Sequence, residues 1–454
     1  MYTPLHIIIL AAGAGTRMKS RIPKVLQTVA ACPMIIHVLK TATQLQPAGI
    51  HVVYNPAARQ VQEACRSFDV TWVLQASQLG TGHAVAQALP GIPNDARVLV
   101  LYGDIPLLEA DSLQTLLAAP SSSLNVLTMR VADPTGYGRV LRDDNNAVTG
   151  IVEEGEASVQ QKSISEVNSG IIVAPRSVLS SCLDNTASDN SQNEYYLTDI
   201  FDIAYNNGIP TNGVIASTPA DLEGANDRIQ RASLEQRYRM KKSTELMRAG
   251  VQLADPQRLD VRGKVETGTD VYIDVNVILE GNISLGDNVS IGPGCVLKNC
   301  QLAAGTRVHA YSVLEEMRSL GACDIGPFAR IRPGTELGEG SKVGNFVEIK
   351  NTSLGDHSKA SHLSYLGDSS IGERVNIGAG TITCNYDGVN KHRTVIEDDV
   401  FIGSDTQLVA PLRIGEGADI GAGSTITKDA PAGHLTISRT RQVTIPAWKR
   451  PEKK

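Results

Sequence analysis

Residues Ile396–Ile426 read IEDDVF IGSDTQ LVAPLR IGEGAD IGAGST I, and an aliphatic residue begins each block of six. The same spacing links aliphatic residues over 273–297, 325–349 and 371–377, and glycine often follows directly. This pattern is typical of a hexapeptide β-helix, in which each aliphatic side chain points inward and stacks on its counterpart one coil away. The second half of the chain is therefore predicted to be a narrow β-helix.

The six-residue spacing is interrupted at two places. It weakens over residues 301–320, which we interpret as an irregular coil. The segment Cys384–Lys391 has turn composition and no repeat, so residues 383–394 are predicted to form an extruded loop. Loops on rigid scaffolds commonly carry function.

Composition agrees with a turn-rich prism in the second half. Of the 41 glycines, 25 lie beyond residue 250, and aromatic residues make up only 4% of the chain. A narrow prism has little room for aromatic side chains. The length of 454 residues is too great for one ordinary domain, so at least two domains are expected.

The first 220 residues have a different pattern, in which short apolar runs alternate with amphipathic stretches. This order predicts an α/β domain with a largely parallel sheet, whose ligands bind at the carboxyl ends of the strands. The expected strands are His6–Leu10, His51–Tyr54, Thr71–Gln75, Val98–Tyr102 and Asn125–Arg130, and the expected helices include Pro33–Gln46 and Gly82–Leu89. Residues Asp221–Gly250 are predicted to form one charged helix that connects the halves.

Charge is unevenly distributed along the chain. The net charge is −6, yet residues 1–62 contain six Lys and Arg residues and no Asp or Glu. A basic N-terminus on an acidic protein indicates a local anion site and argues against general nucleic-acid binding.

The cysteine and hydropathy patterns indicate where in the cell the protein is located. The seven cysteines form no CxxC pair and no framework spacing, which indicates reduced thiols in a cytoplasmic protein. The apolar run Ile7–Ala12 is too short for a membrane helix and has no preceding Lys or Arg, as a signal peptide would. No membrane association is expected.

A glycine-rich turn, LAAGAGTRMK over residues 10–19, follows the first predicted strand. Such turns let backbone N–H groups close on phosphate oxygens. A dinucleotide-binding fingerprint fails because Met18 stands where the third glycine should be, and a Walker loop fails because no Gly-Lys-Ser/Thr follows. Arg17 and Lys24 add positive charge, so the turn is predicted to hold a triphosphate.

This turn resembles the signature of the sugar-1-phosphate nucleotidylyltransferases, present here as LAAGAGTRMKSRIPK. Together with the hexapeptide half, the whole chain resembles the bacterial family that combines N-acetylglucosamine-1-phosphate uridylyltransferase with glucosamine-1-phosphate N-acetyltransferase. The resemblance implies three parts. They are a Rossmann-like uridylyltransferase domain over 1–228, a helical linker over 229–249, and a left-handed parallel β-helix with N-acetyltransferase activity over 250–454.

The resemblance implies a uridylyl-transfer site in the first domain. Arg17 and Lys24 would act on the phosphates, and Asp104 and Asn226 would bind Mg²⁺, for which a carboxylate and an amide are ordinary oxygen ligands. Nucleotidyl transfer needs charge neutralisation and in-line positioning more than a protein nucleophile. The other implied contacts are Leu10, Ala11, Ala12 and Gly13 for the nucleotide, Gln75, Gln78, Gly80 and Thr81 for uracil, Tyr102 and Gly103 beside Asp104, and Gly138, Glu153 and Asn168 for the sugar.

The resemblance implies a second site in the β-helix. His362 would be the general base that deprotonates the attacking amine, a task that suits an imidazole near neutral pH, and Glu348 would orient it. The implied sugar-phosphate contacts are Arg332, Lys350, Tyr365, Asn376 and Lys391, and the implied acetyl-CoA contacts are Ala379, Asn385, Tyr386, Ser404, Ala422 and Arg439.

The implied enzyme acetylates glucosamine-1-phosphate with acetyl-CoA. It then transfers UMP from UTP to N-acetylglucosamine-1-phosphate and releases pyrophosphate, which supplies UDP-N-acetylglucosamine for peptidoglycan and lipopolysaccharide. The family is homotrimeric, with acetyl-transfer sites between adjacent prisms.

Two alternatives remain open. In one, the chain is a nucleotidylyltransferase whose β-helix only trimerises or regulates it, and His362 with the Asn385–Tyr386 loop argues against this. In the other, the chain is a non-catalytic binding solenoid, and the presence of Lys24, Asp104 and Asn226 in their motifs argues against that.

Overall fold

The computed structural model describes residues 3–13, 15–56 and 59–451, and Ala14 of the glycine-rich turn lies outside them. The chain divides into two compact units, Met1–Tyr238 (unit 1) and Arg239–Lys454 (unit 2). The boundary lies within a single helix, α8 (Arg228–Arg248). The expected limits at residues 228 and 249 remain a prediction. Among the described residues, we find no helix whose length and apolar character would let it span a bilayer.

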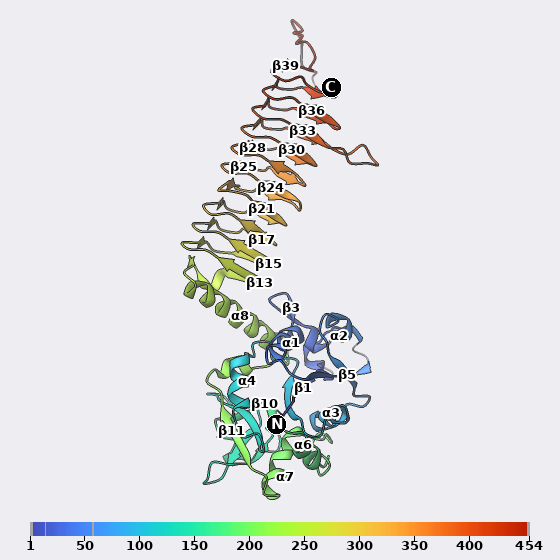
Figure 1. Ribbon diagram of the computed structural model, residues 1–454, viewed down its shortest axis with the longest axis vertical. Helices are drawn as coiled ribbons and strands as arrows, with labels where there is room; N and C mark the ends of the chain where they lie inside the picture. The colour runs from blue at the N-terminus through green and yellow to red at the C-terminus, as the bar shows by residue number, and fades with distance from the viewer. Residues whose placement is uncertain (1–2, 14, 57–58, 452–454) are drawn as a thin grey trace. The chain divides into compact units, whose positions relative to one another are not determined.

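Unit 1 contains a nine-stranded sheet with the order β11-β7-β10-β6-β1-β4-β5, while β8 and β9 extend it beside β10 (Figure 1). The five strands predicted from sequence are all present, with ends that differ by at most two residues. The sheet is mixed, because β10 runs antiparallel between β6 and β7. Its strands are β1 (Leu5–Leu10), β4 (Gly49–Tyr54), β5 (Thr71–Leu74), β6 (Arg97–Tyr102), β7 (Leu124–Arg130), β8 (Arg139–Arg142), β9 (Val148–Val152), β10 (Glu166–Pro175) and β11 (Thr211–Ile215).

Helices cover both faces of this sheet. Alternate residues of β1 enter different cores: Ile7 and Ile9 pack in one cluster, and Ile8 and Leu10 in the other. The first cluster includes side chains of α1 (Met34–Gln44) and α4 (Ala110–Leu117). The second includes α3 (Thr81–Ala88), α6 (Arg176–Leu183) and α7 (Ile200–Asn206). Two-sided burial explains why β1 is continuously apolar. The remaining helices are α2 (Arg59–Ala64) and α5 (Val159–Lys162).

The charged helix is shorter than the sequence predicts. It begins at Arg228 and not at Asp221. Residues Pro219–Leu222 form a 3₁₀ turn, and Leu222 and Ala225 are buried in the cores of unit 1. Tertiary burial therefore overrides the helical pattern before residue 228.

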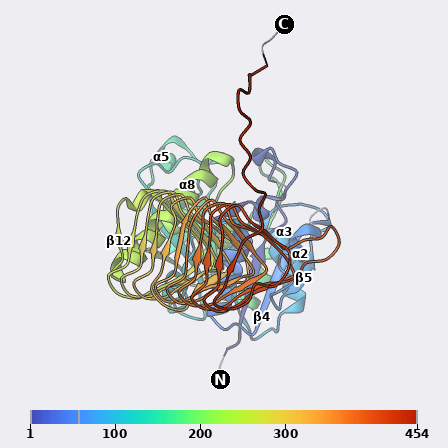
Figure 2. The ribbon, with the colours of Figure 1, turned by 90° about the horizontal axis from the view of Figure 1, so that it is seen from above.

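Unit 2 is a stack of parallel coils, whose outlines overlap when seen from above (Figures 1 and 2). One sheet of eleven strands and one of seventeen run along the stack. Every aliphatic residue of the predicted six-residue repeat is at least 97% buried, which confirms the repeat. The eleven-stranded sheet consists of β12 (Gln252–Leu253), β14 (Tyr272–Ile273), β16 (Ser290–Ile291), β19 (Arg307–Val308), β22 (Asp324–Ile325), β25 (Lys342–Asn345), β28 (Lys359–His362), β31 (Asn376–Ile377), β34 (Phe401–Ile402), β37 (Asp419–Ile420) and β39 (Leu435–Thr436).

The prediction of an irregular coil over residues 301–320 is wrong. Val308 pairs in register with Ile291 and with Ile325, seventeen residues away in each direction, where Ile273 and Ile291 are eighteen apart. Each coil here is one residue shorter, which shifts the phase of the aliphatic spacing without breaking the stack. Leu302, Val308 and Leu314 are all buried.

The predicted extruded loop is confirmed. Ile377 pairs with Ile402, so this coil has seven residues more than an eighteen-residue coil. The extra chain leaves the stack between β32 (Ile382–Cys384) and β33 (Thr394–Ile396) and forms a small hairpin, which projects in both views (Figures 1 and 2). We refer to residues 385–393 as the hairpin.

One corner of the prism carries exposed aromatic side chains. Tyr311, Phe328 and Phe346 follow successive strands of the eleven-stranded sheet, and each has a positive φ between 56° and 58°. Their rings stack with centroids 5.3 and 5.4 Å apart, and each side chain is about half exposed. We call these three residues the aromatic ladder.

Candidate active sites

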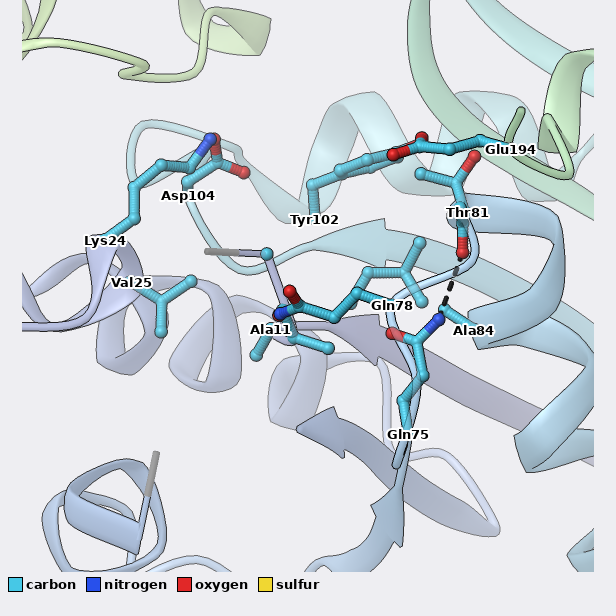
Figure 3. A pocket seen from close by; sticks show the side chains of 14 residues that line it. Ala11, Lys24, Val25, Gln75, Gln78, Thr81, Ala84, Tyr102, Asp104 and Glu194 are labelled. Atoms are coloured by element: carbon cyan, nitrogen blue, oxygen red, sulfur yellow. Dashed lines mark hydrogen bonds and ion pairs between the residues drawn. The ribbon is translucent and has the colours of Figure 1, made fainter. Parts of the chain in front are cut away.

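A cavity of about 330 Å³ lies at the carboxyl ends of the strands in unit 1 (Figure 3). Strand β1 lies between β4 and β6, so the order of the strands reverses here, where α/β sheets place their ligands. Eleven residues singled out from the sequence line it: Leu10, Ala11, Ala12, Gly13, Lys24, Gln75, Gln78, Gly80, Thr81, Tyr102 and Asp104. Val25, Ala84 and Glu194 also line it and were not expected.

The glycine-rich turn brings Lys24 to the cavity. Gly15 has a φ of 60°, and a Cβ atom there would lie 2.7 Å from the Cβ atom of Lys24. Glycine therefore permits both the left-handed backbone and the close approach of the two segments. Arg17 lies exposed on the 3₁₀ turn Thr16–Met18 and does not line the cavity.

Lys24, Asp104 and Asn226 form one cluster at the end of the cavity. The Lys24 Nζ atom lies 2.5 Å from Asp104 Oδ2 and donates to Asn226 Oδ1 at 2.9 Å. Both oxygens predicted to bind Mg²⁺ therefore converge on a single ammonium group. A carboxylate and an amide oxygen aimed at one cation suit Mg²⁺, which keeps water and substrate phosphates as its remaining ligands. Among the described residues, no group of three or more His, Cys, Asp and Glu could hold a metal by itself.

Two glutamines line the end of the cavity near α3. Gln75 is buried, and its amide donates to Gly80 O at 3.1 Å. Gln78 donates to the carbonyl of Ala12, which ties the segment after β5 to the glycine-rich turn. These contacts fix the two glutamine side chains that the family resemblance assigns to uracil.

The segment that carries Glu194 packs on the N-terminus of α3. A Cβ atom at Gly80, where φ is 107°, would lie 2.5 Å from the carbonyl oxygen of Tyr195, and Leu197 N donates to Thr81 Oγ1 at 3.1 Å. Glu194 thereby reaches the cavity beside Thr81 and Tyr102 (Figure 3). Its polar surroundings in the sequence give no periodic signal that could have identified it.

None of the three residues assigned to the sugar lines this cavity, although the Glu153 carboxylate lies near Tyr102, which does. Asn168 N donates to Gly138 O at 2.9 Å, and a Cβ atom on Gly138 would lie 3.4 Å from Glu153. Burial raises the pKa of Glu153, whose carboxylate accepts from Thr198 at 3.0 Å. Burial and then the carboxylates of Glu153 and Asp104 raise the pKa of the Tyr102 phenol. Gly103 does not line the cavity, and its N–H donates to Leu10 O at 3.0 Å.

In unit 2, one column along the aromatic corner carries His362 and three residues assigned to acetyl-CoA. Each lies two residues after a core position of the eleven-stranded sheet. The column runs through Asn345, His362, Ala379, Ser404 and Ala422. Arg439 joins its C-terminal end, because its guanidinium donates to Ala422 O at 2.7 Å.

His362 is oriented by an amide. Its Nδ1 atom lies 2.7 Å from Asn345 Oδ1. Because an amide oxygen only accepts, Nδ1 carries the proton, and Nε2 of the neutral ring keeps a lone pair. The predicted partner, Glu348, instead accepts from Arg332 at 2.8 Å. Asn345 lies seventeen residues before His362, and no motif in the sequence marks it.

A second group of residues surrounds an open pocket of about 600 Å³ at another corner. Lys350 and Lys391, both assigned to the sugar phosphate, line this pocket together with Asp368. Burial alone would raise the pKa of Asp368, but hydrogen bonds from Asn351 and Asn385 and the two lysine charges hold it below its usual value. The charge of Lys350 in turn lowers the pKa of Lys391. Two cations that repel each other favour a bound dianion.

The remaining residues that the resemblance assigns to the acetyl-transfer site lie around this pocket or on neighbouring coils. A Cβ atom on Gly367 would lie 2.5 Å from the Tyr365 hydroxyl and 2.8 Å from the Asn385 amide, so both side chains cover Gly367. Tyr386 lies exposed in the hairpin. Asn376 lies on β31, in register with Lys359 and Phe401.

Comparisons with known proteins cover both units. The model of the MobA-like NTP transferase domain matches residues 7–162, and that of the bacterial transferase hexapeptide (six repeats) matches residues 393–428. A bifunctional protein GlmU of Alkalilimnicola ehrlichii is 51% identical over 99% of this chain and 97% of its own length. Another, of Xanthomonas axonopodis pv. citri, is 52% identical over the full length of both chains. A solved nucleotidyl transferase from Methanothermobacter thermautotroptrophicus is 17% identical, with a TM-score of 0.39, over 52% of this chain and 97% of that one.

Proposed function

The chain belongs to the family of bifunctional GlmU proteins, and we propose which of its residues carry out each of the two reactions. It is a uridylyltransferase and an N-acetyltransferase of UDP-N-acetylglucosamine biosynthesis. Unit 1 transfers UMP from UTP to N-acetylglucosamine-1-phosphate, and unit 2 transfers acetyl from acetyl-CoA to glucosamine-1-phosphate.

In unit 1, the cavity at the ends of β1 and β6 binds UTP and the sugar phosphate. Residues 10–13 and Gln75, Gln78, Gly80 and Thr81 hold the nucleoside, while Lys24, with Arg17, neutralises the phosphates. The phosphate oxygen of the sugar attacks the α-phosphorus of UTP in line, and pyrophosphate leaves. Gly138, Glu153 and Asn168 orient the sugar beside Tyr102.

Asp104 and Asn226 would hold Mg²⁺, which supplies charge stabilisation to the phosphate oxygens when bound. The convergence of both oxygens on Lys24 Nζ is the observation that carries this assignment. It shows that the chain folds so that three separate segments meet around one positive charge.

In unit 2, His362 Nε2 accepts a proton from the amine of glucosamine-1-phosphate as the nitrogen attacks the thioester carbon of acetyl-CoA. The C–S bond then breaks, the amide remains on the sugar, and coenzyme A leaves as a thiol with the proton that His362 took up. The Nδ1–H bond to Asn345 Oδ1 presents that lone pair. The sugar phosphate is bound by Arg332, Lys350, Tyr365, Asn376 and Lys391. Glu348 accepts a hydrogen bond from the Arg332 guanidinium and so holds that cation in place. Ala379, Asn385, Tyr386, Ser404, Ala422 and Arg439 bind acetyl-CoA.

The functional unit is a homotrimer, in which adjacent prisms complete each acetyl-transfer site. The aromatic ladder supports this proposal, because it continues the corner on which His362 lies and exposes stacked apolar rings. The protein works in the cytoplasm, for which the seven free cysteines are the supporting observation.

Paired assays on the full-length chain test these assignments. With UTP, N-acetylglucosamine-1-phosphate and Mg²⁺, Asp104→Ala should lower pyrophosphate release about 100-fold or more and leave acetyl transfer unchanged. With acetyl-CoA and glucosamine-1-phosphate, His362→Ala should lower thiol release about 100-fold or more and leave uridylyl transfer unchanged.

Two exposed residues outside both sites serve as controls, Asp144→Ala and His357→Ala, and should leave both activities intact. Normal thiol release by His362→Ala would show that the acetylation assignment is wrong. Absence of thiol release by the unaltered chain would show that the β-helix has no acetyltransferase activity and serves only as a scaffold.

A further inference from the structure

Asp387 accepts three of the hydrogen bonds that close the hairpin of unit 2. Asp387 Oδ1 accepts from the backbone N–H groups of Val389 at 2.8 Å and Asn390 at 2.6 Å, which forms the turn at the tip. Gly388, with a φ of 100°, allows the chain to reverse there. These backbone hydrogen bonds, together with that from His392, lower the pKa of the Asp387 carboxyl well below its usual range.

The other oxygen of Asp387 reaches the returning strand. His392 Nε2 donates to Asp387 Oδ2 at 2.7 Å, and the backbone N–H of His392 donates to Asn385 O at 2.8 Å. Asp387 thus joins the outgoing strand, the tip and the returning strand. We call the hydrogen bond between His392 and Asp387 the clasp.

The base of the hairpin is anchored without the clasp. Asn385 is buried, and its amide donates to Asp368 Oδ2 at 2.5 Å. Beyond this anchor, Tyr386 and Lys391 form one antiparallel bridge, and both residues are exposed. A two-stranded hairpin of this size is marginally stable alone, so its closed form depends on local hydrogen bonds.

We propose that the clasp between Asp387 and His392 is a positioning device, which holds Tyr386 and Lys391 in the arrangement that binds the acyl donor and the sugar phosphate. This inference rests on the proposed function, because that proposal assigns Tyr386 to acetyl-CoA and Lys391 to the phosphate. Neither Asp387 nor His392 touches a reacting atom in this scheme. His392 also lines the pocket of Lys350 and Lys391, whereas Asp387 does not. Asp387 therefore acts on the substrates only through Tyr386 and Lys391, and His392→Gln separates the clasp from a direct contact of His392 with the pocket.

The clasp should govern KM more than kcat. When the hairpin is open for part of the time, only the closed fraction binds substrate, and the apparent affinity falls by that fraction. Once both substrates are bound, they hold the hairpin closed, and His362 reacts at its normal rate. We expect Asp387→Ala and His392→Ala to raise the KM for acetyl-CoA and for glucosamine-1-phosphate by about fivefold to tenfold, with kcat within about twofold.

Conservative variants separate the clasp from simple loss of structure. His392→Gln keeps an N–H donor for Asp387 Oδ2 and should stay within about twofold of the unaltered KM values. Asp387→Asn keeps an oxygen for the tip N–H groups and removes the charge, so its KM values should fall between those of the unaltered chain and Asp387→Ala. Asp356→Ala and His434→Ala are matched controls. Asp356 accepts a hydrogen bond from the backbone N–H of Glu339, and the His434 ring contacts the carbonyl oxygen of Ala432. Both contacts lie outside the hairpin, so neither variant should change the KM for acetyl-CoA or for glucosamine-1-phosphate.

Limited proteolysis gives a readout that does not depend on activity. Lys391 and Arg393 are exposed, and trypsin cuts an opened hairpin faster than a closed one. Asp387→Ala and His392→Ala should be cut here about fivefold faster than the unaltered chain and the two controls. Equal cutting rates would contradict the clasp.

Tyr386→Ala and Lys391→Ala separate failure of the clasp from failure of the proposed function. If these two raise the KM values and the Asp387 and His392 variants do not, the hairpin belongs to the site and the clasp is wrong. If none of the four changes a KM value, the assignment of the hairpin to the acetyl site is wrong, and the clasp is overturned with it.

Discussion

Asp199 is an acidic residue in an acidic and partly buried environment of unit 1. It ends the 3₁₀ turn Leu197–Asp199, directly after the threonine that hydrogen-bonds Glu153. Burial, followed by the charges of Glu153, Asp189 and Asp202, raises its pKa to about 6. The folded chain therefore retains a proton on Asp199 at pH values where the unfolded chain, with a pKa of about 3.9, has lost it.

This difference makes stability depend on pH. Between about pH 4 and pH 6 the folded state binds more protons than the unfolded state, so the free energy of unfolding falls as the pH rises. Asp199→Asn should remove this loss and stabilise unit 1 by about 1 kcal/mol at pH 8, after allowance for solvent screening, with no gain at pH 4. Urea unfolding followed by circular dichroism at pH 4, 5, 6 and 8 measures the effect. A gain that is equal at pH 4 and pH 8 would contradict it.

Lys24 occupies the position between Asp104 and Asn226 that a divalent cation would take. Its ammonium group should therefore compete with the metal until a nucleotide phosphate draws it away. Lys24→Met should raise the affinity for Mn²⁺ without nucleotide about tenfold, because it removes a positive charge 2.5 Å from Asp104 Oδ2. Titration calorimetry with Mn²⁺ alone measures this, with Lys40→Met as the control. Unchanged affinity would show that Lys24 does not restrict access of the metal.

At the scale of elements, the strands were predicted within two residues because their apolar runs record burial directly. The coils at residues 301–320 were not predicted correctly. A coil of seventeen residues shifts the position of the aliphatic residues by one, so the six-residue spacing breaks in the sequence. In the structure Leu302 and Val308 nevertheless remain buried. The helix start at Arg228 was missed because burial of Leu222 and Ala225 is a tertiary effect with no local signal.

Core residues of the coils should contribute equally wherever they lie in the stack, since each coil contacts only its neighbours. Leu297, on β17 (Val296–Lys298), is fully buried, and Leu297→Ala should lower the free energy of unfolding of unit 2 by about 2–4 kcal/mol. Leu320, which is 62% exposed, is the control, and Leu320→Ala should cost less than about 0.5 kcal/mol. Urea unfolding measures both. Pyrophosphate release at a permissive temperature should be unaffected.

At the scale of the whole molecule, the structure brings residues of several sequence motifs together in one cavity of unit 1. The cavity of unit 1 collects most residues that its motifs contain, because they end strands that meet at one edge of the sheet. Asn345 and Glu194 were not predicted. Asn345 lies next to His362 because of the coil length, and Glu194 reaches the cavity because of the fold of its loop. Neither feature follows from a short motif. The roles of all these residues remain proposals.

The proposed trimer makes a prediction that separates the two activities. Non-glycine residues rarely adopt a positive φ, yet Tyr311, Phe328 and Phe346 all do so with their rings exposed. The same φ recurs at other coil corners, as at Asn288, His357 and Arg374, so the exposed rings are the feature that points to a partner. A partner chain that covers the rings would bury their apolar area. The double variant Phe328→Asp/Phe346→Asp should therefore shift the chain from trimer to monomer in analytical ultracentrifugation. Because we propose that a neighbouring prism completes each acetyl-transfer site, the variant should also abolish thiol release. It should preserve pyrophosphate release, whose proposed site lies in unit 1. Val159→Asp, at an even more exposed apolar residue of unit 1, should leave the trimer intact. A double variant that stays trimeric would show that copies associate through another face of the prism.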